Sequence, residues 1–181
     1  MNRFLVVVAL IGMAACDAPW SGPTLPDGAH EISLRQLSVQ GGPFDLAPDI
    51  VASTSLSDVR QQVIAHAIRA RFDEQHVCLP AATGLCWGQF SQEQGVVYVA
   101  VITNYECTSA VKERTAVGGQ TLYFIHWVGN PQGVCNASMA VPSWRLYSAS
   151  RHDLPGTGTL KVRFELQGTE HGAIDTQVAL S

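Results

Sequence analysis

The sequence carries little charge, and most of that charge is negative. Lys and Arg together number 11 and Asp and Glu number 15, so only 14% of the 181 residues are charged and the formal net charge is −4. Proteins that bind nucleic acid or anionic lipid headgroups use clusters of Lys and Arg for this purpose. The composition therefore argues against nucleic acid and against anionic headgroups as partners.

Motifs of the common catalytic families are also missing. The chain has no G-x-S-x-G, no H-E-x-x-H, no P-loop and no G-x-G-x-x-G, each of which positions a nucleophile, a metal or a phosphate. Ser109 and Lys112 have the S-x-x-K spacing of penicillin-binding proteins, but the companion motifs S-D-N and K-T-G are absent. We expect no cofactor, and a non-enzymatic role is favoured over an enzymatic one.

The sequence has only one long apolar run, and it lies at the N-terminus. Residues 1–3 give a short basic start, residues 4–12 are apolar, and the small residues Ala14 and Ala15 precede Cys16. This apolar run is too short to cross a bilayer as a helix, and the pattern is typical of a secretory signal peptide.

The residues before Cys16 resemble the lipobox of bacterial lipoproteins. In that family the signal peptide is cut immediately before the cysteine, which becomes the mature N-terminus and carries the acyl chains. The resemblance covers residues 1–16 and implies lipidation of Cys16. Several acyl chains make a stable anchor, whereas one alone binds only marginally. We therefore expect the protein in the cell envelope, held by lipid on the inner or outer membrane and facing the periplasm or the exterior.

Four cysteines remain when Cys16 is set aside: Cys78, Cys86, Cys107 and Cys135. An even number in an exported chain predicts two disulfides. Four cysteines allow three pairings, of which we favour Cys78 with Cys86 and Cys107 with Cys135. The alternative is that His76, Cys78 and Cys86 hold a metal ion, which would require thiolates that stay reduced. The oxidising compartment favours the disulfides, so we expect no metal.

The composition divides the chain into three parts. Residues 1–15 form the signal peptide, and residues 16–28 form the lipidated cysteine with a tether rich in Pro and Gly. If it is extended, such a tether reaches about 30–35 Å from the bilayer. Residues 29–181 are long enough for a single domain with a substantial core, and we expect that domain to be disulfide-bonded.

The clearest helix signal lies at residues 57–75. Apolar residues recur there at intervals of three and four on one face, from Val59 and Val63 to Phe72. Ser55 and Asp58 have the spacing of a capping box, although Ser57 could also begin the helix. Because it has one apolar stripe, this helix is expected to pack on a sheet.

Most of the remaining sequence predicts strands. Residues 30–40 alternate with one phase slip, which indicates a strand with a bulge. Residues 43–54 resemble a loop, residues 96–102 a central strand buried on both faces, and residues 137–149 two short strands or one edge strand because of Pro142. Further strands are expected at 120–128, 159–166 and 173–180. The fold class is therefore α+β, a mostly antiparallel sheet or sandwich with one amphipathic helix.

Two further patterns could indicate a function, but a structural interpretation is favoured for each. Residues 154–158 read LPGTG, the sortase sorting signal, but alternating strand residues follow in place of an apolar span. A turn between strands accounts for this proline and these glycines. His126 lies among aromatic residues of a strand, where a hydrogen-bonded histidine on a sheet face is favoured over a catalytic base.

Aromatic residues near loops are the best candidates for contacts with a partner. Trp87 follows Cys86, and Trp144 follows Pro142; aromatic side chains are enriched at the centres of interfaces. The alternative for each is a place at the rim of the core. The sequence as a whole favours a non-enzymatic binding or assembly module with an envelope protein partner. The alternatives are a small hydrolase of cell-wall or peptide substrates and an inhibitor of a secreted enzyme.

Overall fold

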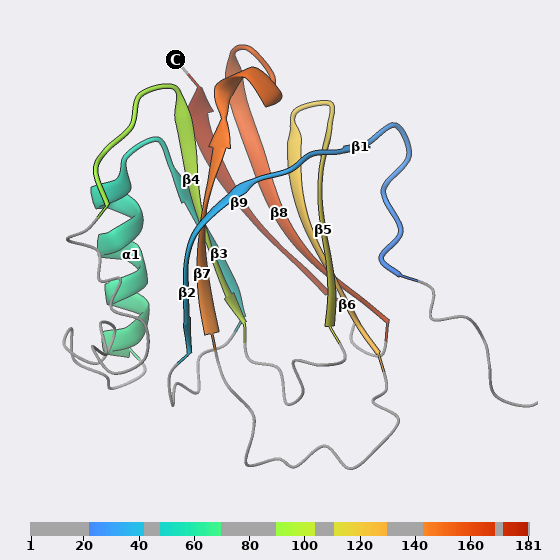
Figure 1. Cartoon of the computed structure of the whole chain (residues 1–181), viewed down its shortest axis with the longest axis horizontal. Helices are drawn as coiled ribbons and strands as arrows, with labels where there is room; N and C mark the ends of the chain where they lie inside the picture. Colours follow the sequence, from blue (N-terminus) through green and yellow to red (C-terminus); the bar gives the residue numbers. More distant parts are fainter. Residues whose placement is uncertain are drawn as a thin grey trace, which may run out of the picture.

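The computed structural model describes residues 22–41, 48–69, 90–103, 111–129, 143–168 and 172–180. These residues form two β-sheets, one α-helix and a short 3₁₀ helix (Figure 1). The elements are β1 (His30–Glu31), β2 (Arg35–Gly41), β3 (Asp49–Ser53), α1 (Leu56–Arg69), β4 (Val96–Thr103), β5 (Val111–Gly118), β6 (Thr121–Val128), β7 (Ser143–Ser150), the short 3₁₀ helix η4 (Arg151–Asp153), β8 (Gly158–Gly168) and β9 (Gly172–Leu180). The expected combination of many strands with one helix is confirmed.

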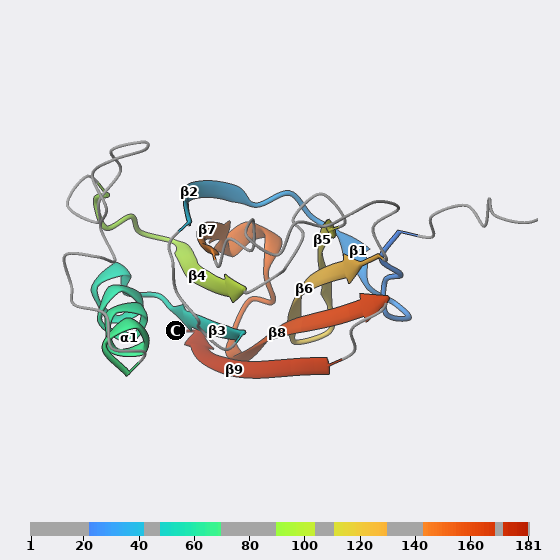
Figure 2. The same ribbon diagram turned by 90° about the horizontal axis from the view of Figure 1, so that it is seen from below.

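One sheet has the strand order β1-β5-β6-β8-β9 and the other the order β2-β7-β4-β3. All pairs are antiparallel except β6 with β8, which run parallel, so the five-stranded sheet is mixed. The sheets approach each other where β3 lies near β9, and they diverge towards β2 and β5 (Figure 2). On the divergent side the chain crosses from β1 in one sheet to β2 in the other.

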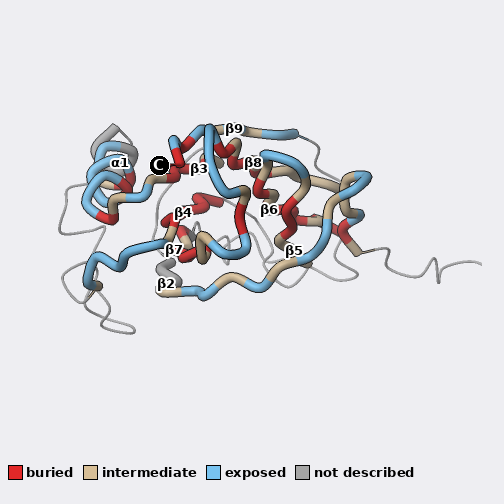
Figure 3. The backbone as a smooth tube through the Cα atoms, turned by 90° about the horizontal axis from the view of Figure 1, so that it is seen from above, coloured by how far each residue is buried: buried red, intermediate tan, exposed pale blue. Residues whose placement is uncertain are grey.

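The main core lies between the inner faces of the two sheets. Every second residue of β4 (Val97, Val99, Val101) meets alternating residues of β6 and β8, such as Phe124 and Val162, in one buried cluster. Figure 3 shows the buried stretches of the chain on the strands of both sheets. Alternation places these side chains on one face because successive residues of a strand point to opposite sides.

Helix α1 covers the outer face of the four-stranded sheet. Val59 and Val63 of the predicted apolar stripe are buried there against Tyr98, Ala100 and Ile102 of β4. Strand β4 is therefore buried on both faces, as its continuous apolar run predicts. The Ser55 hydroxyl accepts a hydrogen bond from the Asp58 backbone N–H at 3.2 Å, which is the expected cap. The predicted extension of the helix to residue 75 lies outside the described residues.

Three predictions about strands need correction. Residues 30–40 form two strands in different sheets rather than one, although a register shift between Gln36 and Ser38 supplies the expected bulge. Residues 49–53, expected in a loop, form β3, whose central residues are buried. Strand β7 is flanked by β2 and β4 and is not an edge strand. It begins at Ser143, so the strand contains no proline.

The sequence gives a weak signal for β5. Its middle residues, Lys112 to Thr115, are polar or charged on both faces, so apolar alternation is lost. The strands predicted at 120–128, 159–166 and 173–180 are confirmed as β6, β8 and β9. The LPGTG residues begin with the buried Leu154 and lead through a bend into β8, which is the expected turn.

Gly168 is required at the end of β8 by both its backbone and its surroundings. Its φ is +99°, and a Cβ at this position would lie 2.1 Å from the Val128 carbonyl oxygen. A side chain therefore has neither an allowed conformation nor space. We expect Gly168→Ala to lower the free energy of unfolding by about 2–4 kcal/mol, as measured by urea denaturation.

Gly156 provides the matched control for this substitution. A Cβ there would have no atom within 4 Å, and the backbone does not adopt positive φ. Gly156→Ala should change the free energy of unfolding by less than about 0.5 kcal/mol. Equal losses in the two variants would contradict the packing described around Gly168.

Candidate functional site

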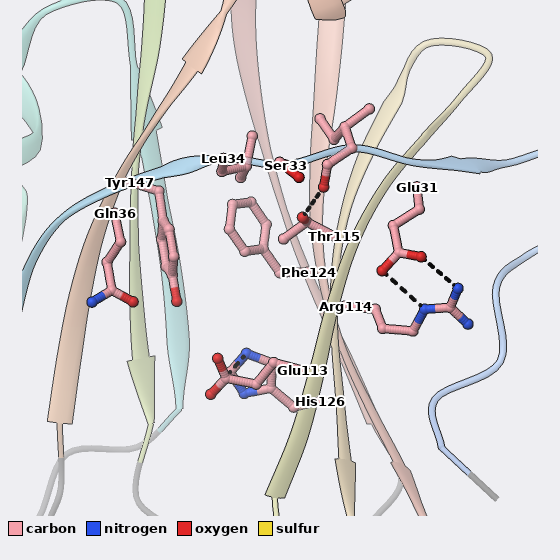
Figure 4. A pocket seen from close by; sticks show the side chains of 11 residues that line it. Glu31, Ser33, Leu34, Gln36, Glu113, Arg114, Thr115, Phe124, His126 and Tyr147 are labelled. Atoms are coloured by element: carbon pink, nitrogen blue, oxygen red, sulfur yellow. Dashed lines mark hydrogen bonds and ion pairs between the residues drawn. The ribbon is translucent and has the colours of Figure 1, made fainter.

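A cavity of about 300 Å³ opens where the two sheets diverge. Its walls come from the crossing segment between β1 and β2, from β5 and β6 of one sheet and from β7 of the other (Figure 4). The crossing segment is held to β5 by two hydrogen bonds, from the Ile32 N–H to the Thr115 carbonyl (3.0 Å) and from the Thr115 hydroxyl to the Ile32 carbonyl (2.6 Å). The cavity therefore has a fixed rim.

Glu113 and His126 line one end of this cavity, and the Arg145 guanidinium pairs with Glu113 there. Glu113 of β5 and His126 of β6 are direct partners across the strand pair, and His126 Nε2 lies 3.9 Å from Glu113 Oε1. Arg145 of β7, in the opposite sheet, donates through Nη1 to the same Glu113 oxygen. The Glu113–Arg145 ion pair thus connects the two sheets where their apolar core ends.

His126 is held in its neutral form. Its side chain is only 2% exposed, and its ring packs edge-to-face with that of Phe164, with the ring centroids 4.8 Å apart. Burial lowers the pKa of His126 to about 3, because removal from water penalises the imidazolium. A base this weak is poorly suited to abstract a proton near neutral pH.

Two aromatic residues line the cavity between the sheets. Phe124 of β6 and Tyr147 of β7 lie with ring centroids 5.3 Å apart at an angle of 52°. Burial raises the pKa of the Tyr147 phenol, while neighbouring Arg145 acts in the opposite direction. The phenol therefore remains a neutral hydrogen-bonding group beside an apolar ring.

A second ion pair, between Glu31 and Arg114, stands beside the cavity. The Arg114 guanidinium donates to both carboxylate oxygens of Glu31, at 2.6 and 3.2 Å, and these bonds lower the pKa of Glu31. Its remaining nitrogen, Nη1, donates to the Pro23 carbonyl at 3.2 Å. Arg114 therefore links the cavity to the N-terminal segment.

Most residues singled out by the sequence lie outside the described part of the chain. These are Cys16, Cys78, Cys86, Cys107 and Cys135, together with Trp87 and His76, so the lipidation, the disulfides and the His76 metal site stay predictions. Within the described residues, no group of three or more His, Cys, Asp and Glu side chains is placed to hold a metal ion. Lys112 lies in strand β5, and a strand does not give the helical geometry that S-x-x-K requires.

Trp144 does not form the surface contact that was expected. It is 2% exposed and packs with Leu146 and Tyr98 in the cluster beneath α1. The physical reason is that β7 lies inside its sheet and that the face on which Trp144 lies is covered by α1. His126, in contrast, occupies a sheet face as predicted, although that face borders a cavity.

The sequence does not reveal the polar end of the cavity because Glu113 comes from β5 and its partner Arg145 from β7, in the other sheet. Once Val117 is assigned to the core, alternation along β5 places Glu113 and Thr115 on the same inward face. The same rule applied to β7 places Arg145 inward with Tyr147. The sequence therefore contains this signal, but only after both strands and their inner faces are known.

No family model, no curated protein and no solved structure matches this chain. No helix in the described ranges is long and apolar enough to cross a membrane. We therefore infer the function from the chemistry of the cavity and from the sequence of the N-terminus.

The neutral state of buried His126 makes folding stability depend on pH. The unfolded histidine, with a pKa near 6.5, binds a proton at pH 5, whereas folded His126, with a pKa of about 3, does not. Stability is therefore present above pH 6.5 and is lost as the pH falls towards 3. From pH 7 to pH 5 the loss from this group should be about 2 kcal/mol.

Urea denaturation of the wild type and of His126→Leu at both pH values measures this contribution. His126→Leu should remove that part of the pH dependence, whereas replacement of the exposed His152 by Gln should leave it intact. Glu113, Arg145 and Tyr147 stay in place in both variants, so their contributions cancel. The same pH dependence in His126→Leu and wild type would show that His126 is not buried as described.

A double-mutant cycle tests the ion pair between the sheets. The Glu113 and Arg145 side chains are 31% and 23% exposed, so removal of one partner leaves a poorly solvated charge. We expect a coupling free energy of about 1–2 kcal/mol between Glu113→Gln and Arg145→Met in denaturant titrations.

The control pair is Lys161 and Asp175, which are 2.8 Å apart and 37% and 40% exposed. The coupling free energy of this pair should stay below about 1 kcal/mol. A Glu113–Arg145 coupling no larger than that of the control would contradict the ion pair's role between the sheets.

Proposed function

We propose that this protein is a bacterial envelope lipoprotein, anchored through lipidated Cys16, whose domain is a non-enzymatic binding module with the inter-sheet cavity as its ligand site. The two sheets would form a sandwich that is open on the side of β2 and β5. The shared apolar core supports this description. So does the crossing segment, which spans the diverging edges.

The state of the charged groups in the cavity carries the proposal for binding. Glu113 is paired with Arg145, Glu31 is paired with Arg114, and His126 stays neutral. A general base must be able to take a proton from its substrate near the working pH, and neither the paired carboxylates nor the low pKa of His126 suits that task. Paired charges and a phenol, in contrast, can exchange hydrogen bonds with a ligand.

The chemistry of the walls indicates the kind of ligand. Acidic, basic and neutral polar side chains surround the aromatic residues Phe124 and Tyr147. These walls favour a ligand that is small and polar and also has an apolar part. Binding sites often combine apolar walls with a few fixed polar groups. A side chain or short segment of an envelope protein partner satisfies both conditions.

The rival function is hydrolysis of a cell-wall or peptide substrate, with Glu113 as its acidic residue. The observation that favours it is the 3.9 Å approach of Glu113 to His126 in a concave site. This function requires Glu113 to exchange its ion pair with Arg145 for a contact with substrate or water. The experiment below separates the two functions.

A photo-crosslinking amino acid placed at Gln36 tests for a ligand. Gln36 lines the cavity and is exposed, so in living cells it should give one adduct of defined mass. The same amino acid at Gln177, exposed on β9, should not give that adduct. Arg145→Lys should weaken the adduct from position 36, because the lysine ammonium positions the lining residue Glu113 less rigidly than the planar guanidinium does.

The intact mass of the protein from its native membrane tests the anchor. An acylated N-terminal Cys16, with four cysteines that resist alkylation until they are reduced, is the expected result. An unmodified Cys16 would refute the lipoprotein assignment. Turnover of cell-wall or peptide substrate that is abolished by Glu113→Gln, without a Gln36 adduct, would establish the hydrolase instead.

A further inference from the structure

The N-terminal segment lies on the domain over much of the length that the sequence assigns to a tether. Pro23 is buried, and its carbonyl accepts a hydrogen bond from Arg114. The side-chain amide of Gln167 pairs with the backbone of Thr24 on both sides, accepting from its N–H at 2.8 Å and donating to its carbonyl at 3.0 Å. The chain is thus held to the domain at Pro23 and Thr24.

With the anchor at Cys16, five residues, 17–21, separate it from Gly22, the first described residue. An extended chain advances at most about 3.3–3.6 Å per residue, so the six steps from Cys16 to Gly22 span at most about 20 Å. A domain of about 150 residues has a radius of gyration of about 15 Å, and its diameter therefore exceeds that reach. Such a tether cannot turn the opposite side of the domain towards the bilayer.

The side on which Gly22 lies is the outer face of the five-stranded sheet. A Cβ on Gly22 would lie 3.9 Å from Lys112 Cδ, and Lys112 is the direct partner of Trp127 across β5 and β6. The Lys112 Nζ lies 5.7 Å from the centroid of the Trp127 ring. Figures 1 and 2 place this N-terminal segment and α1 at opposite ends of the domain.

We infer that the outer face of the five-stranded sheet around Lys112 and Trp127 is the surface that the domain presents to the lipid bilayer. The inference rests on the proposed lipid anchor at Cys16. Trp and Lys suit this position because the indole ring favours the headgroup region and the lysine stem can lie on apolar surface while its ammonium group stays hydrated. Trp127 and Lys112 are both partly exposed.

The charge of this face fits zwitterionic headgroups. Both lysines of the chain lie on it, Lys112 in β5 and Lys161 in β8. Lys161 and Arg163 are offset by Asp175 at 2.8 and 3.7 Å. Glu165 lies 3.6 Å from Arg163, so these three basic and two acidic side chains leave about one net positive charge on the face. The chain as a whole has a net charge of −4, and this face avoids the repulsion that a purely acidic face would meet at a membrane.

Tryptophan quenching by brominated phosphatidylcholine measures the position of this face. The full lipidated chain is placed in vesicles of phosphatidylcholine and phosphatidylethanolamine, and the emission of Trp127 is taken as the difference between wild type and Trp127→Phe. We expect brominated lipid to reduce this emission at least about two-fold, since bromine quenches only near the bilayer. Emission from Trp144, obtained in the same way from Trp144→Phe, should be unchanged because that residue is buried beneath α1.

Two companion variants make each outcome decisive. Insertion of roughly ten Gly and Ser residues after residue 21 lengthens the tether and should restore most of the Trp127 emission; quenching that persists would contradict the argument from tether length. If the wild-type chain floats with vesicles but Trp127 is not quenched, the inferred orientation is wrong while the anchor stands. If the wild-type chain and Cys16→Ala both fail to float, the proposed anchor itself is wrong.

Discussion

The packing of the two inner sheet faces against each other is the interaction on which the rest of the structure depends. Neither sheet can bury its apolar side alone, and the shared cluster that includes Val99, Phe124 and Phe164 removes both inner faces from water. Helix α1 adds a second, smaller cluster on only one outer face. The other outer face is left to charged side chains and to the N-terminal segment.

The cavity exists because this core does not extend to the divergent side of the sheets. Where β2 and β5 separate, apolar side chains no longer reach each other, and Glu113 and Arg145 meet across the space instead. A charge at this depth is tolerated when its partner comes from the facing sheet. Burial also keeps His126 neutral. Glu113 therefore has one charged partner, Arg145, and no histidine cation competes for its carboxylate.

The regular parts of the fold could be predicted from the sequence. Strong alternation in β8, aromatic and β-branched residues in β6, and the two-faced burial of β4 all follow from local patterns, and so does the start of α1 at its cap. The division of residues 30–41 between two sheets could not be predicted, because the alternation of apolar residues in a strand does not reveal which other strand it pairs with. Strand β3 was missed for a related reason: its apolar centre is only three residues long.

The candidate site was less predictable than the fold because it depends on contacts between distant strands. His126 was recognised as a sheet-face residue, but Glu113 and Arg145 gain meaning only from the pairing of β5 with β6 and from the facing of β7. Trp144 was misplaced because proximity to a proline suggested a loop, whereas a strand begins at residue 143. Local sequence therefore indicated the residue types, and tertiary pairing determined which of them meet.

The parallel pairing of β6 with β8 has a consequence for how the chain reaches its native state. The chain leaves β6, forms β7 in the other sheet and only then returns as β8, so Phe124 and Phe164 become neighbours after a long excursion. Contacts of this kind require closure of a large loop before any of their energy is gained, which slows folding. Along the chain, strands of one sheet are interleaved with strands of the other. The two sheets should therefore form in a single cooperative step, and a chain cut between β6 and β8 would lose both.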